Sequence, residues 1–296
     1  MPDGPDGRRG SLEPGTDRLA AALAAAGFVA AEDEAHELVV AAGGDPDALH
    51  ELVERRLAGE PLAWLTGRAP FDGLEVRVDP GVYVPRWQSV PLAHRAAARL
   101  PERGTAIDLC TGSGAVALAL RRAHPGARVV ATDTDRRAVA CARANGVEAY
   151  AGDLFAPVPA ELEGRTDVVV AVVPYVPSPA LRLLPRGTLD VEDVRHYDGG
   201  PDGTAVLRRV ATEAPRFLRP GGALLVELGG DQAELLRPLL EGLGYRSVVT
   251  WADDDGDRRG LAATAGRRRA QPSSGRRRAN GGRGRGTPPA GSPAPR

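Results

Sequence analysis

The sequence predicts an α/β protein with a Rossmann-like, seven-stranded sheet and a small N-terminal helical domain. From about residue 104 onward, short apolar runs alternate with amphipathic helical patterns, whereas before residue 68 the apolar period is helical. Strands that alternate with helices form a mostly parallel sheet with helices on both faces. We expect the strands at residues 105–110, 128–133, 147–151, 166–173, 222–228, 245–252 and 261–265, and the helices at 114–123, 135–145, 202–217 and 231–242.

The last two strands are so close in sequence that we expect them to pair as an antiparallel edge. Residues 101–265 are therefore interpreted as one sheet domain.

Residues 16–67 contain three short helical patterns. Leu19 and Leu23 share a face of the first, the second spans 31–42, and the third follows Pro46. Single helices of this length are marginal in water, so the three patterns predict a small bundle.

Residues 68–100 change to a period of two and then return to a helical pattern. They are interpreted as a hairpin linker, with its turn at Asp79-Pro80-Gly81, and a connecting helix.

Both ends of the chain have compositions that cannot form a core. Residues 1–15 and 266–296 are rich in Gly, Pro and Arg, and we expect both to be disordered. The segment 266–296 holds nine of the 38 basic residues and no acid, so the folded part carries an excess of acids. Only this Arg-rich tail could contact RNA, through phosphates, and a tail that is merely solvated is the alternative hypothesis.

Composition also predicts the compartment. Cys110 and Cys141 form no disulfide framework and no zinc-ligand pattern, so we expect no metal. The N-terminus has no apolar run, and the longest apolar stretch, Val168 to Val173, is far too short to span a bilayer. We therefore expect a cytoplasmic protein with no membrane contact.

The strongest local motif lies between the first strand of the sheet and the helix after it. It reads Asp108-Leu-Cys-Thr111-Gly112-Ser-Gly114, and Asp133 ends the next strand 19 residues later. Glycines allow close approach of a ligand to the backbone, and a carboxylate at the position of Asp133 can accept hydrogen bonds from ribose hydroxyls. The same residues fit the dinucleotide pattern GxGxxA, so this motif alone leaves a nicotinamide cofactor and S-adenosylmethionine open.

Three further features favour S-adenosylmethionine. Asp108 would repel a pyrophosphate but suits the ammonium of a methionine. Asp153-Leu154-Phe155 follows the third strand, where an acid can accept from the adenine amino group and a ring can pack on the base. Pro174-Tyr175 follows the fourth strand at the carboxyl edge of the sheet, where ligands bind.

These residues resemble the HemK-like family of methyltransferases, which modify the N5 atom of a glutamine in peptide-chain release factors. The resemblance covers roughly residues 17–265. It includes the segments Glu60-Pro-Leu-Ala-Trp-Leu-Thr-Gly67, Phe71-Asp-Gly-Leu74, Val78-Asp-Pro-Gly-Val-Tyr-Val-Pro-Arg86 and Glu227-Leu-Gly-Gly-Asp-Gln232. It implies a methyltransferase domain over 101–265, S-adenosylmethionine as cofactor, and a protein substrate. It also implies cofactor contacts at Asp108, Thr111, Gly112, Gly114, Asp133, Asp153, Leu154 and Phe155.

The family motif after the fourth strand is Asn-Pro-Pro-Tyr, which holds the substrate glutamine. This chain reads Val172-Val173-Pro174-Tyr175, and the acid-bearing stretch after Pro85-Arg86 is replaced by Trp87-Gln88-Ser89. We expect Val172, Val173, Pro174 and Tyr175 to shape the acceptor pocket, but the Val172 side chain offers no hydrogen bond. An active methyltransferase and a weak or inactive cofactor-binding interaction protein are therefore the two leading hypotheses, with a nicotinamide-dependent oxidoreductase as the third.

Two further residues, His196 and Glu227, have two interpretations each. His196 and Tyr197 lie in a loop, and we interpret His196 as solvated rather than as a general base. Glu227 either faces the cofactor cleft or makes structural hydrogen bonds.

Overall fold

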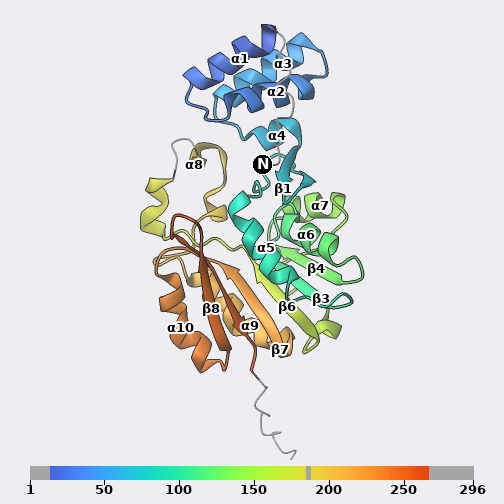
Figure 1. The fold of residues 1–296 in the computed structure, drawn as a ribbon, viewed down its shortest axis with the longest axis vertical. Helices are drawn as coiled ribbons and strands as arrows, with labels where there is room; N and C mark the ends of the chain where they lie inside the picture. Colours follow the sequence, from blue (N-terminus) through green and yellow to red (C-terminus); the bar gives the residue numbers. More distant parts are fainter. Residues whose placement is uncertain (1–13, 185–187, 267–296) are drawn as a thin grey trace, which may run out of the picture.

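A computed structural model describes residues 14–184 and 188–266 of the chain (Figure 1). The expectations for residues 1–13 and for the Arg-rich tail from residue 267, its RNA contact included, concern parts of the chain outside the described residues. No helix within the described residues is long and apolar enough to cross a membrane.

Three helices form a bundle at one end of the molecule, as the sequence predicts (Figure 1). They are α1 (Pro14–Ala25), α2 (Ala31–Ala42) and α3 (Pro46–Leu57). Helix α3 begins where it does because the Asp45 carboxylate accepts the backbone N–H of Asp47 at 2.9 Å, which caps the helix. Leu23, Ala35 and Leu38 are fully buried between the helices.

A short helix and a hairpin join the bundle to the sheet: α4 (Leu62–Thr66), β1 (Arg68–Phe71) and β2 (Leu74–Arg77). The hairpin turns at Asp72-Gly73. The predicted turn at Asp79-Pro80-Gly81 is present, since the Val82 N–H donates to the Asp79 carbonyl at 3.1 Å, but it does not join the two paired strands, so the hairpin predicted there is wrong. Asp72 and Gly73 have φ of 51° and 69°, the left-handed values that match a two-residue turn to the twist of paired strands. The segment after Gly81 instead runs extended to the edge of the sheet.

The main sheet has seven strands in the order β5-β4-β3-β6-β7-β9-β8, which confirms the predicted class. The strands are β3 (Thr105–Leu109), β4 (Arg128–Asp133), β5 (Glu148–Ala151), β6 (Thr166–Ala171), β7 (Leu218–Glu227), β8 (Arg246–Ala252) and β9 (Arg258–Thr264). The first five are parallel to one another, and β9 is antiparallel to both β7 and β8. The expected antiparallel pair is confirmed, but β9, the last strand in sequence, lies inside the sheet.

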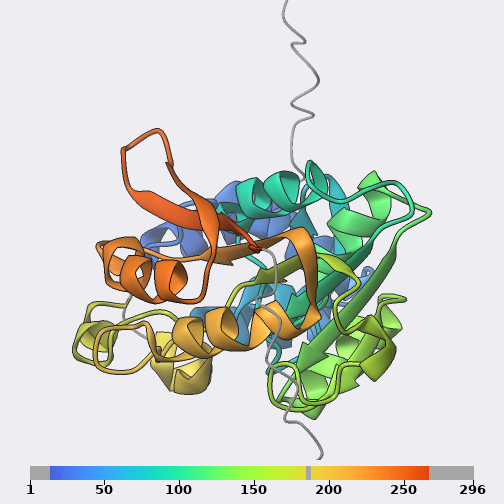
Figure 2. The same cartoon turned by 90° about the horizontal axis from the view of Figure 1, so that it is seen from below.

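Helices cover both faces of the sheet (Figure 2). One layer holds α5 (Val90–Ala97), α6 (Ala115–Ala123) and α7 (Arg136–Ala144), and the other holds α9 (Ala205–Phe217) and α10 (Gln232–Gly242). Side chains alternate along β3, so Ile107 and Leu109 pack under α9 and α10, whereas Ala106 faces the opposite layer. Asp108 therefore points toward α6.

Short elements complete the fold: η1 (Trp87–Ser89), η2 (Ala160–Leu162), η3 (Ser178–Leu183), α8 (Thr188–Val191) and η4 (Val194–His196). The segment from η3 to η4, here called the cover segment (178–184 and 188–197), lies between the bundle and the sheet (Figure 1). The Trp64 indole N–H of α4 donates to the Val82 carbonyl at 2.8 Å, which fixes the bundle to the extended segment beside the sheet.

Candidate active site

A cavity of about 530 Å³ lies at the carboxyl ends of the parallel strands. It is lined by the extended segment around Tyr83, the ends of β3 and β4, the residues after β6, and the cover segment, together with Ala138 of α7, Glu227 of β7 and Arg259 of β9. Among the predicted site residues, Gly112, Asp133, Val172, Val173, Pro174 and Tyr175 line this cavity. The sheet thus brings two motifs that lie about sixty residues apart to one edge, as parallel topology requires.

Gly112 and Asp133 form one wall of the cavity. Gly112 has a φ of 55°, and its N–H donates to Asp133 Oδ2 at 2.9 Å, while the N–H of Asp135 donates to Oδ1 at 2.9 Å. Burial raises the pKa of the Asp133 carboxyl, and these two backbone N–H groups oppose the shift. The carboxylate is held in one orientation at the tip of β4, at the cavity surface.

Asp108 lies under the glycine turn and does not line the cavity. Its side chain is 1% exposed, and it accepts the Thr111 hydroxyl at 2.6 Å. Burial raises the pKa of Asp108 to about 7, although the Thr111 hydroxyl and the Ala117 N–H both lower it. The expected direct contact of Asp108 with a ligand ammonium is therefore corrected, because the alternation of β3 turns this carboxylate toward α6.

Thr111 and Gly114 belong to the glycine turn and do not line the cavity. Thr111 is buried with its hydroxyl on Asp108. Gly114 has a φ of 86°, and a Cβ there would approach Val147 Cγ2 to 3.0 Å and Ala142 Cβ to 3.2 Å. This glycine allows α6 to pack closely on its neighbours.

The segment after β5 differs most from expectation. Leu154 and Phe155 are each 4% exposed, and the Phe155 ring stacks on Phe217 at 4.9 Å within the core. The expected packing of Phe155 on a base is therefore wrong, because the ring completes the core under α9. The Asp153 carboxylate is instead at the surface, paired with Arg209 at 2.6 Å.

At the other end of the cavity, Tyr175 and Ser89 share a carboxylate. The Tyr175 hydroxyl donates to Glu227 Oε1 at 2.9 Å, and the Ser89 hydroxyl donates to Glu227 Oε2 at 2.6 Å. Burial raises the pKa of the Glu227 carboxyl, and both hydroxyl donors oppose the shift. Glu227 fits both of its interpretations. It lines the cavity, and its carboxylate accepts hydrogen bonds from residues 52 and 138 positions away in sequence.

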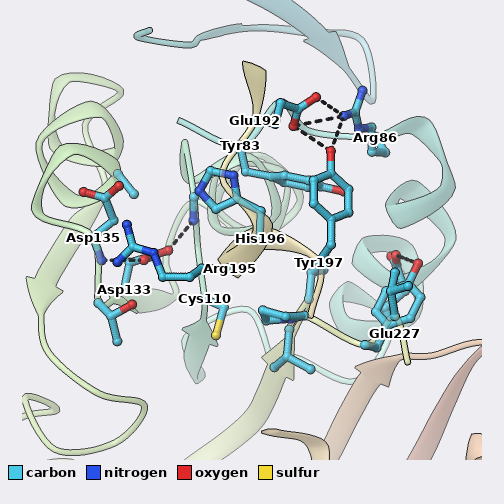
Figure 3. A pocket seen from close by; sticks show the side chains of 18 of the residues that line it. Tyr83, Arg86, Cys110, Asp133, Asp135, Glu192, Arg195, His196, Tyr197 and Glu227 are labelled. Atoms are coloured by element: carbon cyan, nitrogen blue, oxygen red, sulfur yellow. Dashed lines mark hydrogen bonds and ion pairs between the residues drawn. The ribbon is translucent and has the colours of Figure 1, made fainter. Parts of the chain in front are cut away.

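A second polar cluster holds the cover segment over the cavity (Figure 3). Arg86 donates to Glu192 at 3.0 Å and to the Tyr197 hydroxyl at 3.2 Å, and Tyr197 donates to Glu192 at 2.7 Å. His196 lines the cavity with its Nδ1 atom buried, so its interpretation as a solvated loop residue is wrong. Its ring packs edge-on against Tyr83 at 5.8 Å.

Comparison with known proteins places these features in a family. Residues 78–174 match the family described as Methyltransferase small domain. A release factor glutamine methyltransferase of Mycolicibacterium smegmatis is 40% identical over 236 residues, which are 74% of this chain and 83% of that protein. The corresponding protein of Geobacter sulfurreducens is 33% identical over 74% of this chain and 78% of its own length.

The chain belongs to the release factor glutamine methyltransferase family.

Among solved structures, the protein-(glutamine-N5) methyltransferase of Alicyclobacillus acidocaldarius is 27% identical, with a TM-score of 0.40, over 62% of this chain and 94% of that one. Family membership rests on the sequence matches, and it decides between the two cofactors that the glycine motif left open. S-adenosylmethionine is the cofactor of this methyltransferase.

The residues at the cavity fit this cofactor. Gly112 and Asp133 present a left-handed turn and a fixed carboxylate side by side, where ribose hydroxyls can donate. Within residues 14–184 and 188–266, no group of three His, Cys, Asp or Glu side chains is arranged to hold a metal ion.

Several cavity residues had no recognisable pattern in the sequence. Tyr83, Arg86 and Glu192 come from irregular segments and Arg195 from the three-residue η4. The contact of Arg86 with Glu192 joins residues 106 positions apart. A single sequence shows no sign of such a pair. One local indication that this part of the chain reaches the site was the resemblance of Val78 to Arg86 to the family. Another was the departure from the family at residues 87–89.

Proposed function

We propose that this chain transfers a methyl group from S-adenosylmethionine to the side-chain amide nitrogen of a glutamine in a peptide-chain release factor. The observation that carries the proposal is the 40% identity to a release factor glutamine methyltransferase over 83% of that protein's length. The cavity at the carboxyl edge of the sheet supports it, because the cofactor motif and the Val172–Tyr175 segment line the same space. The cytoplasmic location expected from the sequence is part of this proposal.

The proposed cofactor contacts differ in how directly each residue acts. Asp133 accepts the ribose hydroxyls, and the Gly112 turn approaches the methionine part. Asp108 and Thr111 act through the turn, which their hydrogen bond stabilises from below. Asp153 accepts from the adenine amino group once it exchanges its partner Arg209 for the ligand.

The end of the cavity at Tyr175 and Glu227 is here called the acceptor end, and the opposite end, at Gly112 and Asp133, the cofactor end. The acceptor end must compensate for the weak nucleophilicity of the substrate amide. An amide nitrogen shares its lone pair with the carbonyl, so transfer requires the NH2 group to be held by acceptors, in line with the methyl group and away from water. The nitrogen lone pair forms the new N–C bond, the electrons of the broken S–C bond remain on sulfur, and the nitrogen then releases one proton to water. No strong general base is needed, because proton loss follows transfer.

Exposed apolar side chains beside the cavity favour a protein over a small molecule as acceptor. Trp87, which is 70% exposed, lies in sequence between the cavity residues Arg86 and Gln88, and Leu183, 75% exposed, precedes the cavity residue Leu184. Exposed apolar groups that gather beside a site are typical of protein contacts.

Val172 supports a second candidate, a cofactor-binding interaction protein without catalysis. The Val172 side chain cannot hold the amide, and loss of one preorganised contact lowers a rate by about 10²–10³. Labelled S-adenosylmethionine, mixed with purified chain and a release factor, tests the two. We expect transfer to the release factor but not to its Gln→Ala variant at the modified position, by peptide mass spectrometry. Tight binding of S-adenosylhomocysteine with no transfer would contradict the proposal and support the interaction protein.

A further inference from the structure

The carboxylates at the cavity are already engaged by the protein itself. Glu227 accepts Ser89 and Tyr175, and Glu192 accepts Arg86 and Tyr197. Asp133 accepts two backbone N–H groups. An acceptor amide that enters this space needs a hydrogen-bond acceptor, and an atom that no protein group already uses can bind it without sharing these contacts.

Two residues that line the cavity each have one buried side-chain atom without a hydrogen-bond partner within the described residues: Gln88 at Oε1 and His196 at Nδ1. A buried polar atom without a partner is destabilising, so such an atom in a residue that lines a ligand cavity indicates a contact that the ligand completes.

The two atoms lie toward different ends of the site. His196 interacts electrostatically with Asp133 and Asp135, at the cofactor end (Figure 3). Gln88 is adjacent in sequence to Ser89, which reaches Tyr175 through Glu227. On its other side, Val90 packs in the same apolar cluster as Val172. Residues 88–90 and the 172–175 segment are thus joined through Glu227 and pack against one apolar cluster.

We infer that Gln88 holds the acceptor amide, a role that the Val172 side chain cannot fill. Its side-chain carbonyl accepts one N–H of the incoming NH2 group, and the backbone carbonyl of Val173, a residue that also lines the cavity, accepts the other. Gln88 carries no charge, so it accepts this hydrogen bond without a carboxylate beside the reacting methyl group. The inference rests on the proposed function, since it names the residue that positions that function's acceptor.

A rescue experiment tests this assignment. Methyl transfer to the release factor is measured for the natural chain, Gln88→Leu, Gln88→Glu, Val172→Asn and the double variant Gln88→Leu/Val172→Asn. We expect Gln88→Leu to lower kcat about 100-fold, as loss of one positioned contact does, with unchanged S-adenosylhomocysteine affinity. Gln88→Glu keeps an acceptor and should retain activity within about tenfold of the natural chain, and Val172→Asn should restore most of the loss in the double variant.

A binding cycle keeps the inference testable apart from transfer. Affinity of the S-adenosylhomocysteine complex for the release factor and for its Gln→Ala variant is measured with Gln88 and with Leu at position 88. Non-additive effects of the two substitutions, one at position 88 and one at the release-factor glutamine, on the binding free energy support the assignment. Additive effects overturn it.

Other outcomes overturn the inference or the function separately. Normal transfer by Gln88→Leu, or loss and rescue with His196→Leu instead, would overturn the assignment of Gln88 and leave the proposed function intact. A methyl group found on Gln88 itself by mass spectrometry would make Gln88 an acceptor rather than a holder, which also overturns it. No transfer by any variant, Val172→Asn included, would refute the proposed function itself.

Discussion

The two ends of the cavity are built in different ways. At the cofactor end, Asp108 accepts Thr111 three residues away, and Asp133 accepts backbone N–H groups of Gly112 and Asp135. At the acceptor end, the contacts of Glu227 join residues 52 and 138 positions apart. The cofactor end is therefore stabilised by its own motifs, whereas the acceptor end depends on several distant segments. A residue of one segment can consequently take over the binding of the acceptor amide from a residue of another segment. We infer that Gln88 does so for position 172.

The largest expected effect concerns the buried acid under the glycine turn. Burial raises the folded-state pKa of Asp108 to about 7 from an ordinary value of 3.8, so the folded protein holds this proton more tightly than the unfolded chain. This contribution to the free energy of unfolding is fully present below pH 4. It falls by up to about 4 kcal/mol as the pH rises to about 7, at ~1.4 kcal/mol per pKa unit. Urea unfolding of the cofactor-free protein at pH 4.5, 6 and 7.5 should show this loss for the natural chain relative to Asp108→Asn. Parallel pH dependence in the two proteins would contradict it.

The next effect separates a cofactor contact from a fold contact. Asp133→Ala should weaken S-adenosylhomocysteine binding about 100-fold, or ~2.7 kcal/mol, in calorimetric titration. Asp167→Ala is the matched control, because Asp167 also accepts a backbone N–H, that of Thr105 at 2.8 Å, but at the opposite edge of the sheet. It should lower stability and leave affinity unchanged. Equal loss of affinity in both variants would mean that Asp133 acts only through folding.

The smallest effect concerns the junction at the acceptor end. Glu227→Gln should lower methyl transfer about tenfold, because it weakens two hydrogen bonds to a charged group, yet leave S-adenosylhomocysteine affinity unchanged. Glu148→Gln provides the comparison, since Glu148 also accepts a tyrosine hydroxyl, that of Tyr150 at 2.9 Å, outside the cavity. Should Glu227→Gln weaken cofactor binding as strongly as transfer, the two ends of the cavity would not be independent.

The sequence predicted the sheet well, because apolar periodicity is a local property of strands and helices. It misplaced the hairpin turn, where Asp72-Gly73 competes with Pro80-Gly81 and only the pairing of β1 with β2 decides. It also assigned Asp108 to the ligand, although the alternation of Ile107 and Leu109 along β3 indicates that Asp108 faces the opposite helix layer.

The acceptor end was predictable only in part. Val172 to Tyr175 could be placed because they follow a strand of the parallel sheet. The cover segment could not, because the contacts of Glu192 and Tyr197 with Arg86 depend on how distant loops meet. Phe155 was misassigned for the same reason: its partner Phe217 is remote in sequence.

The position of β9 has a consequence for synthesis of the chain. This strand is synthesised after both of its neighbours, yet it lies between β7 and β8, and Leu261 within it is fully buried. A nascent chain that ends before Arg258 thus leaves β7 with a free edge and β8 without its neighbour, and open edges of this kind pair readily with other chains. Closure of the sheet must therefore await synthesis of residues 258–264, and a chain that terminates between β8 and β9 yields an aggregation-prone product.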